Sequence, residues 1–407
     1  MMTRDDPTFD RAMRFAQDLI RIPGLSGAEG DVAARVMREM VALGFSDVHT
    51  DEVGNVIGIA RGRGAAAPVM LCSHLDVVDV GDIATWEYPP FGGVIADGFV
   101  HGRGAMDIKG PLAIQTYAAA RFIHEPAAGD VIVAHTVLEE RGGWGMAHLM
   151  ATGAVRPAAI IIGEATNGDV CIGHRGRAEI IATLKGLAGH ASAPERARNP
   201  LRGLGALIEA LHSFAQDLES DEILGRATAA PTMVETMPRS RNVIPDRVRV
   251  VLDWRVLPGI LPDAALARLR EYLDHVRLPD GLGMDVDFAT EKQRTWTGLE
   301  DDRRLFTPGF LLDPGHVVAR AAARAITRQT GRAPDLRPWT FATDGGHSCG
   351  VHGIPTIGYA PGEERHAHTN RERLELRKAS TVYDAYPGVI SAVFDVLPTL
   401  EDVDSRG

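Results

Sequence analysis

The sequence predicts an α/β fold in which helices sandwich a mostly parallel sheet, with a smaller α+β domain inserted into it. The chain has 407 residues, more than a single hydrophobic core usually organises, so we expect two domains. In its first part, three nearly continuous apolar segments alternate with helical patterns, as in a parallel sheet that is covered on both faces. The pattern changes after about residue 176 and returns near residue 292, which indicates an insertion.

The first predicted helix, 32–45, follows Ser26 and Glu29, whose spacing indicates a capping box, and it is expected to end near Gly44. A second helix is predicted at 110–124. The apolar segments that we expect to form the parallel strands are 67–76, 129–140 and 158–165.

The inserted domain, 177–291, is predicted to be a small open-faced sandwich built as strand, helix, strand, strand, helix, strand. Its expected strands are 178–187, 232–238, 247–259 and 283–291, and its expected helices are 199–218 and 262–276. The two middle strands should pair with each other. Residues 1–176 and 292–407 would then form the larger domain, with a helix at 316–331 and a strand at 354–361.

The composition is that of an ordinary globular protein with an acidic balance. The chain carries 43 Lys and Arg against 54 Asp and Glu, a net charge of -11. Neither nucleic acid nor an anionic membrane is therefore expected as a partner, and no apolar run is long enough to span a bilayer. Residues 1–13 contain no apolar signal region. Three scattered cysteines do not suggest a disulfide framework, so we expect a cytoplasmic protein; they are Cys72, Cys171 and Cys349.

Acidic and imidazole side chains follow the predicted strands. In open α/β sheets, ligands gather at the carboxyl ends of the strands. The first strand brings His74 and Asp76, which lie two apart and face the same way, so that Asp76 can orient the ring of His74 toward a metal. The next two strands lead to the adjacent Glu139 and Glu140 and to Glu164.

Two loops add further candidates. Asp107 lies in GRGAMDIKG, and the histidines His366 and His368 lie in HAHTNRE. Taken one at a time, these residues have ordinary explanations, such as a helix cap or a solvated histidine. Together they complete a set of two imidazoles and three carboxylates, which suits two Zn²⁺ ions that share one carboxylate and keep a position open for water. The set is His74, Asp107, Glu140, Glu164 and His368.

Several motifs in a fixed order make the sequence resemble the dinuclear-zinc aminoacylase and carboxypeptidase family, which includes acetylornithine deacetylase, succinyl-diaminopimelate desuccinylase and glutamate carboxypeptidase. They are SHLDVVDVG, GRGAMDIKG, LEERGG, IIGEATN, GLAGHASAPE, RNVIPD with DWRVLPG, and AHTNRE, spread from about residue 70 to residue 372. The resemblance implies a zinc-exopeptidase-like catalytic domain and an inserted lid and dimerisation domain.

The resemblance also implies how the metal ligands are shared. One cation is expected on His74, Asp107 and Glu164. The other is expected on Asp107, Glu140 and His368, with Asp107 as the bridge.

Other residues acquire expected roles from the same resemblance. Asp76 would support His74, and Glu139 would act as general base and then as general acid. His190 of the lid would stabilise the oxyanion, in many members at the active site of the neighbouring subunit. Two further lid residues would contact the substrate, and the arginine among them suits a carboxylate; they are Asn242 and Arg255.

The function implied is a metal-dependent amidohydrolase or peptidase that cleaves a C–N amide bond of an N-acyl amino acid or small peptide with a free carboxylate. The expected cofactors are two divalent ions, zinc first, with cobalt, manganese or a single-metal form as alternatives; the expected assembly is a homodimer through the lid. Two other functions stay open. The first is hydrolysis of another C–N bond, in an N-carbamoyl compound or an aromatic amine, with a single Mn²⁺. The second, a catalytically silent binding relative, is disfavoured because Glu139 and Asp107 are present. No role is assigned to His101, His347, His366 or Arg371.

Overall fold

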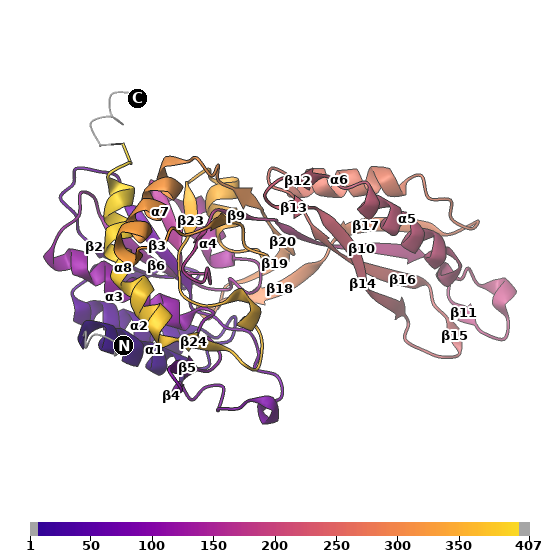
Figure 1. Cartoon of the computed structure of the whole chain (residues 1–407). Coiled ribbons are helices and arrows are strands. Elements are labelled where there is room, and N and C mark those ends of the chain that lie inside the picture. The colour runs from indigo at the N-terminus through magenta and orange to yellow at the C-terminus, as the bar shows by residue number, and fades with distance from the viewer. Residues whose placement is uncertain (1–6, 399–407) are drawn as a thin grey trace.

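The computed structural model describes residues 7–398, which form two lobes of unequal size (Figure 1). Residues 1–6 and 399–407 lie outside the described residues. Both ends of the predicted larger domain therefore lie outside them, as does the beginning of the segment in which no secretion signal is expected. None of the helices between residues 7 and 398 has the length and apolar character needed to cross a membrane.

An eight-stranded sheet forms the centre of the larger lobe. From one edge to the other its strands are β1 (Ser46–Thr50), β2 (Val56–Ala60), β6 (Val131–Thr136), β3 (Val69–His74), β7 (Ala159–Ile162), β23 (Thr356–Gly358), β8 (Val170–Cys171) and β22 (Leu336–Arg337). The run β6, β3, β7, β23 is parallel, whereas β1 and β2 are antiparallel at one edge. The predicted mostly parallel sheet is confirmed.

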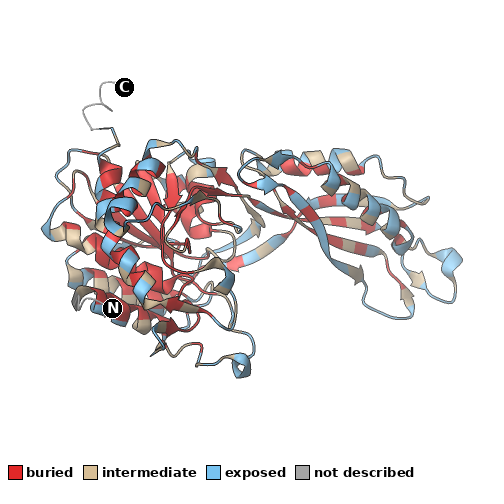
Figure 2. Ribbon diagram, viewed as in Figure 1, coloured by how far each residue is buried: buried red, intermediate tan, exposed pale blue. Residues whose placement is uncertain are grey.

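Alternate side chains of the central strands enter two separate cores. Val69 and Leu71 pack on one face, and Met70 and Cys72 pack on the other. The first face is covered by α1 (Pro7–Ile20), α2 (Gly30–Leu43), α3 (Lys109–His124), α7 (Val317–Thr330) and α8 (Leu376–Phe394), and the second by α4 (Trp144–Thr152) and the π-helical turn η4 (Gly346–Val351). Burial on both faces explains why these strands are apolar throughout, and buried residues fill the lobe (Figure 2).

The predicted capping box before α2 is wrong. The helix begins at Gly30, and its N-cap, Glu29, makes no side-chain capping bond. The Ser26 hydroxyl instead donates to Asp76, 2.7 Å away, because a buried carboxylate needs donors more than the helix end does. The predicted end is confirmed, since Gly44 caps the helix in the left-handed region at φ 94°.

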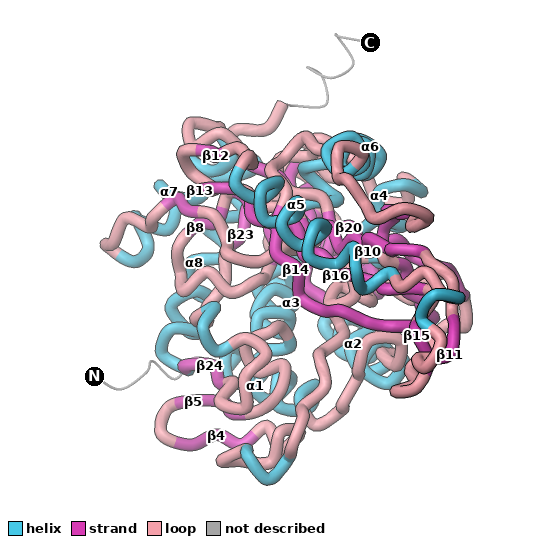
Figure 3. The backbone as a smooth tube through the Cα atoms, turned by 90° about the vertical axis from the view of Figure 1, so that its right-hand side faces the viewer, coloured by secondary structure: helices cyan, strands magenta, loops and turns pink. Residues whose placement is uncertain are grey.

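An antiparallel sheet forms the smaller lobe, in the order β14 (Thr228–Met237), β16 (Arg247–Arg255), β10 (Arg177–Lys185) and β17 (Gly283–Phe288), with β20 (Phe306–Thr307) also paired to β10. Helices α5 (Leu204–Gln216) and α6 (Pro262–Leu273) lie on one face of it (Figure 3). The predicted order of elements and the pairing of the middle strands are confirmed. The boundaries 177–291 stay a prediction, and β20 lies beyond them.

The remaining elements are short, and the sequence analysis does not anticipate them. They are the three-stranded sheet of β4 (Val94–Ala96), β5 (Phe99–His101) and β24 (Arg373–Glu375), the pairs β9 (Gly173–His174) with β21 (Phe310–Leu311), β11 (Gly189–His190) with β15 (Val243–Ile244), β12 (Ser220–Asp221) with β13 (Gly225–Arg226), and β18 (Thr290–Arg294) with β19 (Glu300–Arg304), and the turns η1 (Ile83–Thr85), η2 (Pro194–Arg196), η3 (Pro200–Gly203) and η5 (Glu364–His366). Strand β24 of this three-stranded sheet directly follows the loop that contains His368.

Candidate active site

A cleft of about 670 Å³ is lined by residues of both lobes. The larger lobe contributes mainly acidic side chains, with one imidazole and one arginine, and the smaller lobe contributes two arginines and an acid. These residues include Asp107, Glu139, Glu140, Glu164 and His368 from the first lobe and Arg177, Glu179 and Arg255 from the second.

The structure brings the five predicted metal ligands together. His74 Nε2 lies 3.2 Å from Asp107 Oδ1 and 3.2 Å from Glu164 Oε1. His368 Nε2 lies 3.3 Å from Asp107 Oδ2 and 3.0 Å from Glu140 Oε2. Asp107 therefore stands between the two imidazoles and turns one oxygen toward each.

Topology explains this meeting of residues that are distant in sequence. Because β6, β3 and β7 are adjacent and parallel, their carboxyl ends deliver Glu139, His74 and Glu164 to one edge of the sheet. Asp107 comes from the turn just before α3. His368 arrives on a loop in which its own φ is 59°, a left-handed conformation that non-glycine residues adopt rarely and mostly where the surroundings impose it.

The buried carboxylates of this cluster repel one another. Burial, with the negative charge of neighbouring acids, raises the pKa of Glu140 and of Glu164 to about 7. Burial also holds the pKa of Glu139 well above its usual range, despite the nearby His74. The Glu139 carboxylate has an oxygen within 4.8 Å of ligand atoms of His74 and Glu164. Such a cluster requires positive charge beside it.

The pKa values of the two histidines are raised as well, which favours the charged form of each imidazole. Hydrogen bonds to Asp107 and Glu140 raise the pKa of His368 to about 10. Burial lowers the pKa of His74, but its contacts with Asp107 and other carboxylates outweigh this and raise that pKa well above its usual value. The donor set of imidazole nitrogens and carboxylate oxygens fits divalent transition-metal ions, which would supply the positive charge with both imidazoles neutral.

Asp76 connects a predicted ligand to the predicted base. Its Oδ1 is 3.4 Å from His74 Nδ1, and its backbone oxygen is 2.9 Å from the same nitrogen. Its carboxylate also accepts the backbone N–H groups of Glu139 and Glu140 at 3.2 and 3.3 Å, and the Ser26 hydroxyl. One buried acid thus fixes both the imidazole and the turn that presents the two glutamates.

Glu372 is a supporting residue whose function the sequence analysis misses. It is buried, and its carboxylate accepts the backbone N–H groups of Met106 and Asp107 at 3.0 and 3.1 Å and pairs with Arg103 Nη1 at 2.7 Å. It therefore holds the backbone of the central carboxylate in place. The sequence offers one clue to this role: Glu372 lies four residues after His368, on the same loop.

A second buried acid lies behind the cleft. Asp344 Oδ2 accepts the Thr136 hydroxyl at 2.7 Å, and burial raises the pKa of Asp344 to about 7. His347, from the same segment, lies with Nε2 2.9 Å from the Gly142 carbonyl. These contacts connect the segment that contains η4 to β6, which precedes the two glutamates, and to the turn that follows them.

The predicted residues of the smaller lobe are placed differently from one another. Arg255 lines the cleft and donates to Asp253 at 2.7 Å. His190 lies on β11 and Asn242 directly precedes β15; both are exposed, and this strand pair lies at the end of the lobe farthest from the sheet of the larger lobe (Figure 1). The structure therefore does not bring these two residues into the cleft of their own chain.

Residues 70–392 match the family described as Peptidase family M20/M25/M40. The chain belongs to this family. The resemblance found in the sequence is thereby confirmed, and the protein is a metal-dependent hydrolase.

Curated relatives match most of the chain. An uncharacterized protein of Escherichia coli K12, YgeY, is 32% identical over 381 residues, 92% of this chain and 93% of the relative. A succinyl-diaminopimelate desuccinylase of Cereibacter sphaeroides is 30% identical over 330 residues, 78% of this chain and 82% of the relative.

Solved structures share the fold at lower identity. The Sulfolobus solfataricus metallo-carboxypeptidase Sso-CP2 has a TM-score of 0.76 at 16% identity, covering 95% of this chain and 100% of its own. The Bacillus subtilis YXEP protein, titled a dinuclear metal binding peptidase, has a TM-score of 0.72 at 16% identity, covering 97% and 100%. At these identities the likeness establishes the two-lobed architecture.

Proposed function

We propose that the protein hydrolyses the C–N amide bond of an N-acyl amino acid or a small peptide with a free carboxylate. One observation carries the proposal: each oxygen of Asp107 faces a different imidazole, and the buried carboxylate of Glu139 lies beside this cluster. This is the arrangement expected of a two-metal hydrolytic site with its own general base.

The residues divide into two ligand sets. His74, Asp107 and Glu164 would hold one cation, and Asp107, Glu140 and His368 would hold the other. Zinc suits these donors best, and cobalt or manganese also fit. When bound, the cations polarise the scissile carbonyl and make the attacking water more acidic.

The side chains of the protein perform the remaining steps. Glu139 takes a proton from the attacking water and returns it to the leaving nitrogen. Asp76 orients His74 and, through the N–H of Glu139, fixes the position of the base. Arg255 binds the substrate carboxylate from the smaller lobe, since a guanidinium can form two parallel hydrogen bonds with it.

We also propose that the protein is a cytoplasmic homodimer formed through the smaller lobe. The three free cysteines support a reducing compartment, and β14, an edge strand of the small sheet, offers backbone groups for pairing. His190 would then reach the cleft of the neighbouring subunit and stabilise the tetrahedral oxyanion, with Asn242 contacting the same substrate.

A substrate panel on metal-loaded enzyme tests the reaction. N-acetyl and N-succinyl amino acids and dipeptides should be hydrolysed, with two metal ions per chain by elemental analysis. Glu139→Gln should lower turnover by about 10²–10⁴-fold while metal content stays unchanged. Hydrolysis confined to N-carbamoyl compounds or aromatic amines, with one Mn²⁺, would favour the alternative reaction, and an inert, metal-loaded protein would favour a binding role.

Mixing two inactive variants tests the role of the partner subunit. In a mixed dimer of His190→Ala and Glu139→Gln chains, one cleft combines an intact Glu139 with an intact His190 of the other subunit. Activity should therefore reappear on mixing. If His190 acts within its own chain, or if the protein is monomeric by ultracentrifugation, no activity reappears.

A further inference from the structure

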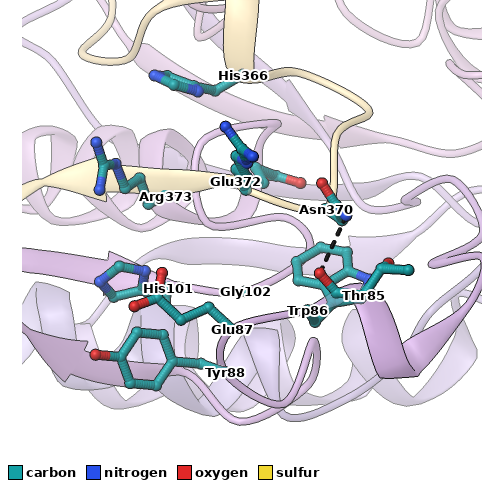
Figure 4. A pocket seen from close by; sticks show the side chains of 11 residues that line it. Thr85, Trp86, Glu87, Tyr88, His101, Gly102, His366, Asn370, Glu372 and Arg373 are labelled. Atoms are coloured by element: carbon teal, nitrogen blue, oxygen red, sulfur yellow. Dashed lines mark hydrogen bonds between the residues drawn. The ribbon is translucent and has the colours of Figure 1, made fainter.

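A second cavity, of about 540 Å³, adjoins the loop that contains His368, and Figure 4 shows side chains that line it. His366 and Asn370 line this cavity, whereas His368 lines the active-site cleft. The loop is therefore a wall between two separate spaces. Asn370 closes one end by donating to the backbone oxygen of Thr85 at 3.1 Å.

Two strands of the small β4–β5–β24 sheet contribute residues to the cavity lining, His101 from β5 and Arg373 from β24. The register of this sheet places Arg373 directly opposite His101, so their side chains are neighbours on one face. The guanidinium of Arg373 lies 4.3 Å from the ring centroid of Phe99. The rings of His101 and Tyr88 lie with their centroids 4.4 Å apart and their planes tilted by 43° (Figure 4). These contacts hold a cation and a polar ring in defined positions.

His101 is buried and has unused hydrogen-bonding capacity. His101 is only 8% exposed. Its Nε2 makes one long hydrogen-bond contact, 3.4 Å from the Ala96 carbonyl oxygen. A buried polar ring normally has closer partners. A ligand in the cavity could supply them.

Two arginines of the cavity lining, Arg371 and Arg373, have no ion-pair partner among the described residues. Glu372, which lies between them, is already paired with Arg103, leaving Glu87 as the other acid of the lining.

We propose that this cavity binds a small organic anion, whose carboxylate or phosphate group lies between Arg371 and Arg373 and whose flat part packs against Trp86 and Tyr88. Arginine pairs with either group through two parallel hydrogen bonds. The aromatic rings provide a broad surface for the rest of the ligand. The site is distinct from the Arg255 position in the cleft, and its occupancy requires no turnover.

Calorimetric titration of the metal-loaded enzyme with benzoate, phenyl phosphate and inorganic phosphate tests the proposal. At least one of the two aromatic anions should bind, and phenyl phosphate should bind more tightly than inorganic phosphate if the rings contribute. Tighter binding of benzoate would identify a carboxylate ligand, and tighter binding of phenyl phosphate would identify a phosphate ligand.

Variants locate the binding site. Arg371 is exposed, so Arg371→Gln should fold and keep its metal content while it binds the anion at least about tenfold more weakly. Arg377→Gln, which removes an exposed arginine paired with Glu375, is the matched control and should bind normally. The proposal is overturned if no probe binds at millimolar concentrations, or if Arg371→Gln leaves binding unchanged. Loss of binding in Arg255→Gln alone would place the anion in the active-site cleft.

Discussion

Replacing Glu372 with alanine should destabilise the larger lobe and weaken metal binding at the same time. The residue is 1% exposed and serves three donors, Arg103 at 2.7 Å and the N–H groups of Met106 and Asp107 at 3.0 and 3.1 Å. Breaking a buried ion pair from one side costs about 3–5 kcal/mol, and each buried N–H left without an acceptor adds about 1–3 kcal/mol. Arg103 keeps two longer contacts to backbone oxygens, so we expect a total near the low end of these ranges, about 5 kcal/mol.

Denaturant unfolding of the metal-free protein measures this loss. Glu372→Gln keeps one acceptor oxygen and should lose less stability than Glu372→Ala. Glu363→Ala, which removes an acid of the same loop paired with Arg365, is the matched control and should lose less than about 1 kcal/mol, as surface pairs do. If Glu372→Ala lost no more than this control, the argument that a buried carboxylate organises the Asp107 turn would be refuted. Metal affinity should fall in parallel, because the Asp107 backbone would lose its acceptor.

Three further predictions address other parts of the site. Glu140→Ala should lose one of the two metal ions in elemental analysis, and a full complement would remove Glu140 from the ligand set. Ser26→Ala deprives Asp76 of a hydroxyl donor at 2.7 Å, so turnover should fall about tenfold with little change in KM or metal content; recovery in Ser26→Thr would separate this effect from general misfolding. Burial lowers the pKa of His174 to about 4, so below about pH 6.5 the unfolded chain binds a proton that the folded chain does not. Stability should therefore fall by up to about 1.4 kcal/mol per pH unit between about pH 6.5 and 4, and urea titrations of His174→Asn should show a smaller slope.

The predicted metal ligands were accessible from sequence because they follow apolar strands that become neighbours in a parallel sheet. For His74, Glu140 and Glu164, strand ends alone predict a common location, and the structure places them in one cluster with Asp107 and His368. The assignment of each residue to a particular cation stays a prediction.

The supporting residues were less accessible because their partners lie far away in sequence. Glu372 contacts a backbone group 265 residues earlier, and Asp344 a hydroxyl 208 residues earlier. Ser26 was misassigned for the opposite reason. Its local spacing to Glu29 matches a helix cap, but a carboxylate 50 residues away takes its hydroxyl instead, so a tertiary contact overrides the local pattern.

The order of the chain has a consequence for synthesis and folding. His74, Asp107, Glu140 and Glu164 precede the smaller lobe, whereas His368 follows it and meets Glu140 across 228 residues. The strand β23, which completes the centre of the sheet, also comes after the insertion. Under the proposed ligand assignment, a growing chain would gather the ligands of the first cation early, while the second site would wait until the smaller lobe has left the ribosome. Metal binding at the second site would then require that synthesis has passed His368 and that the segments before and after the smaller lobe have come together.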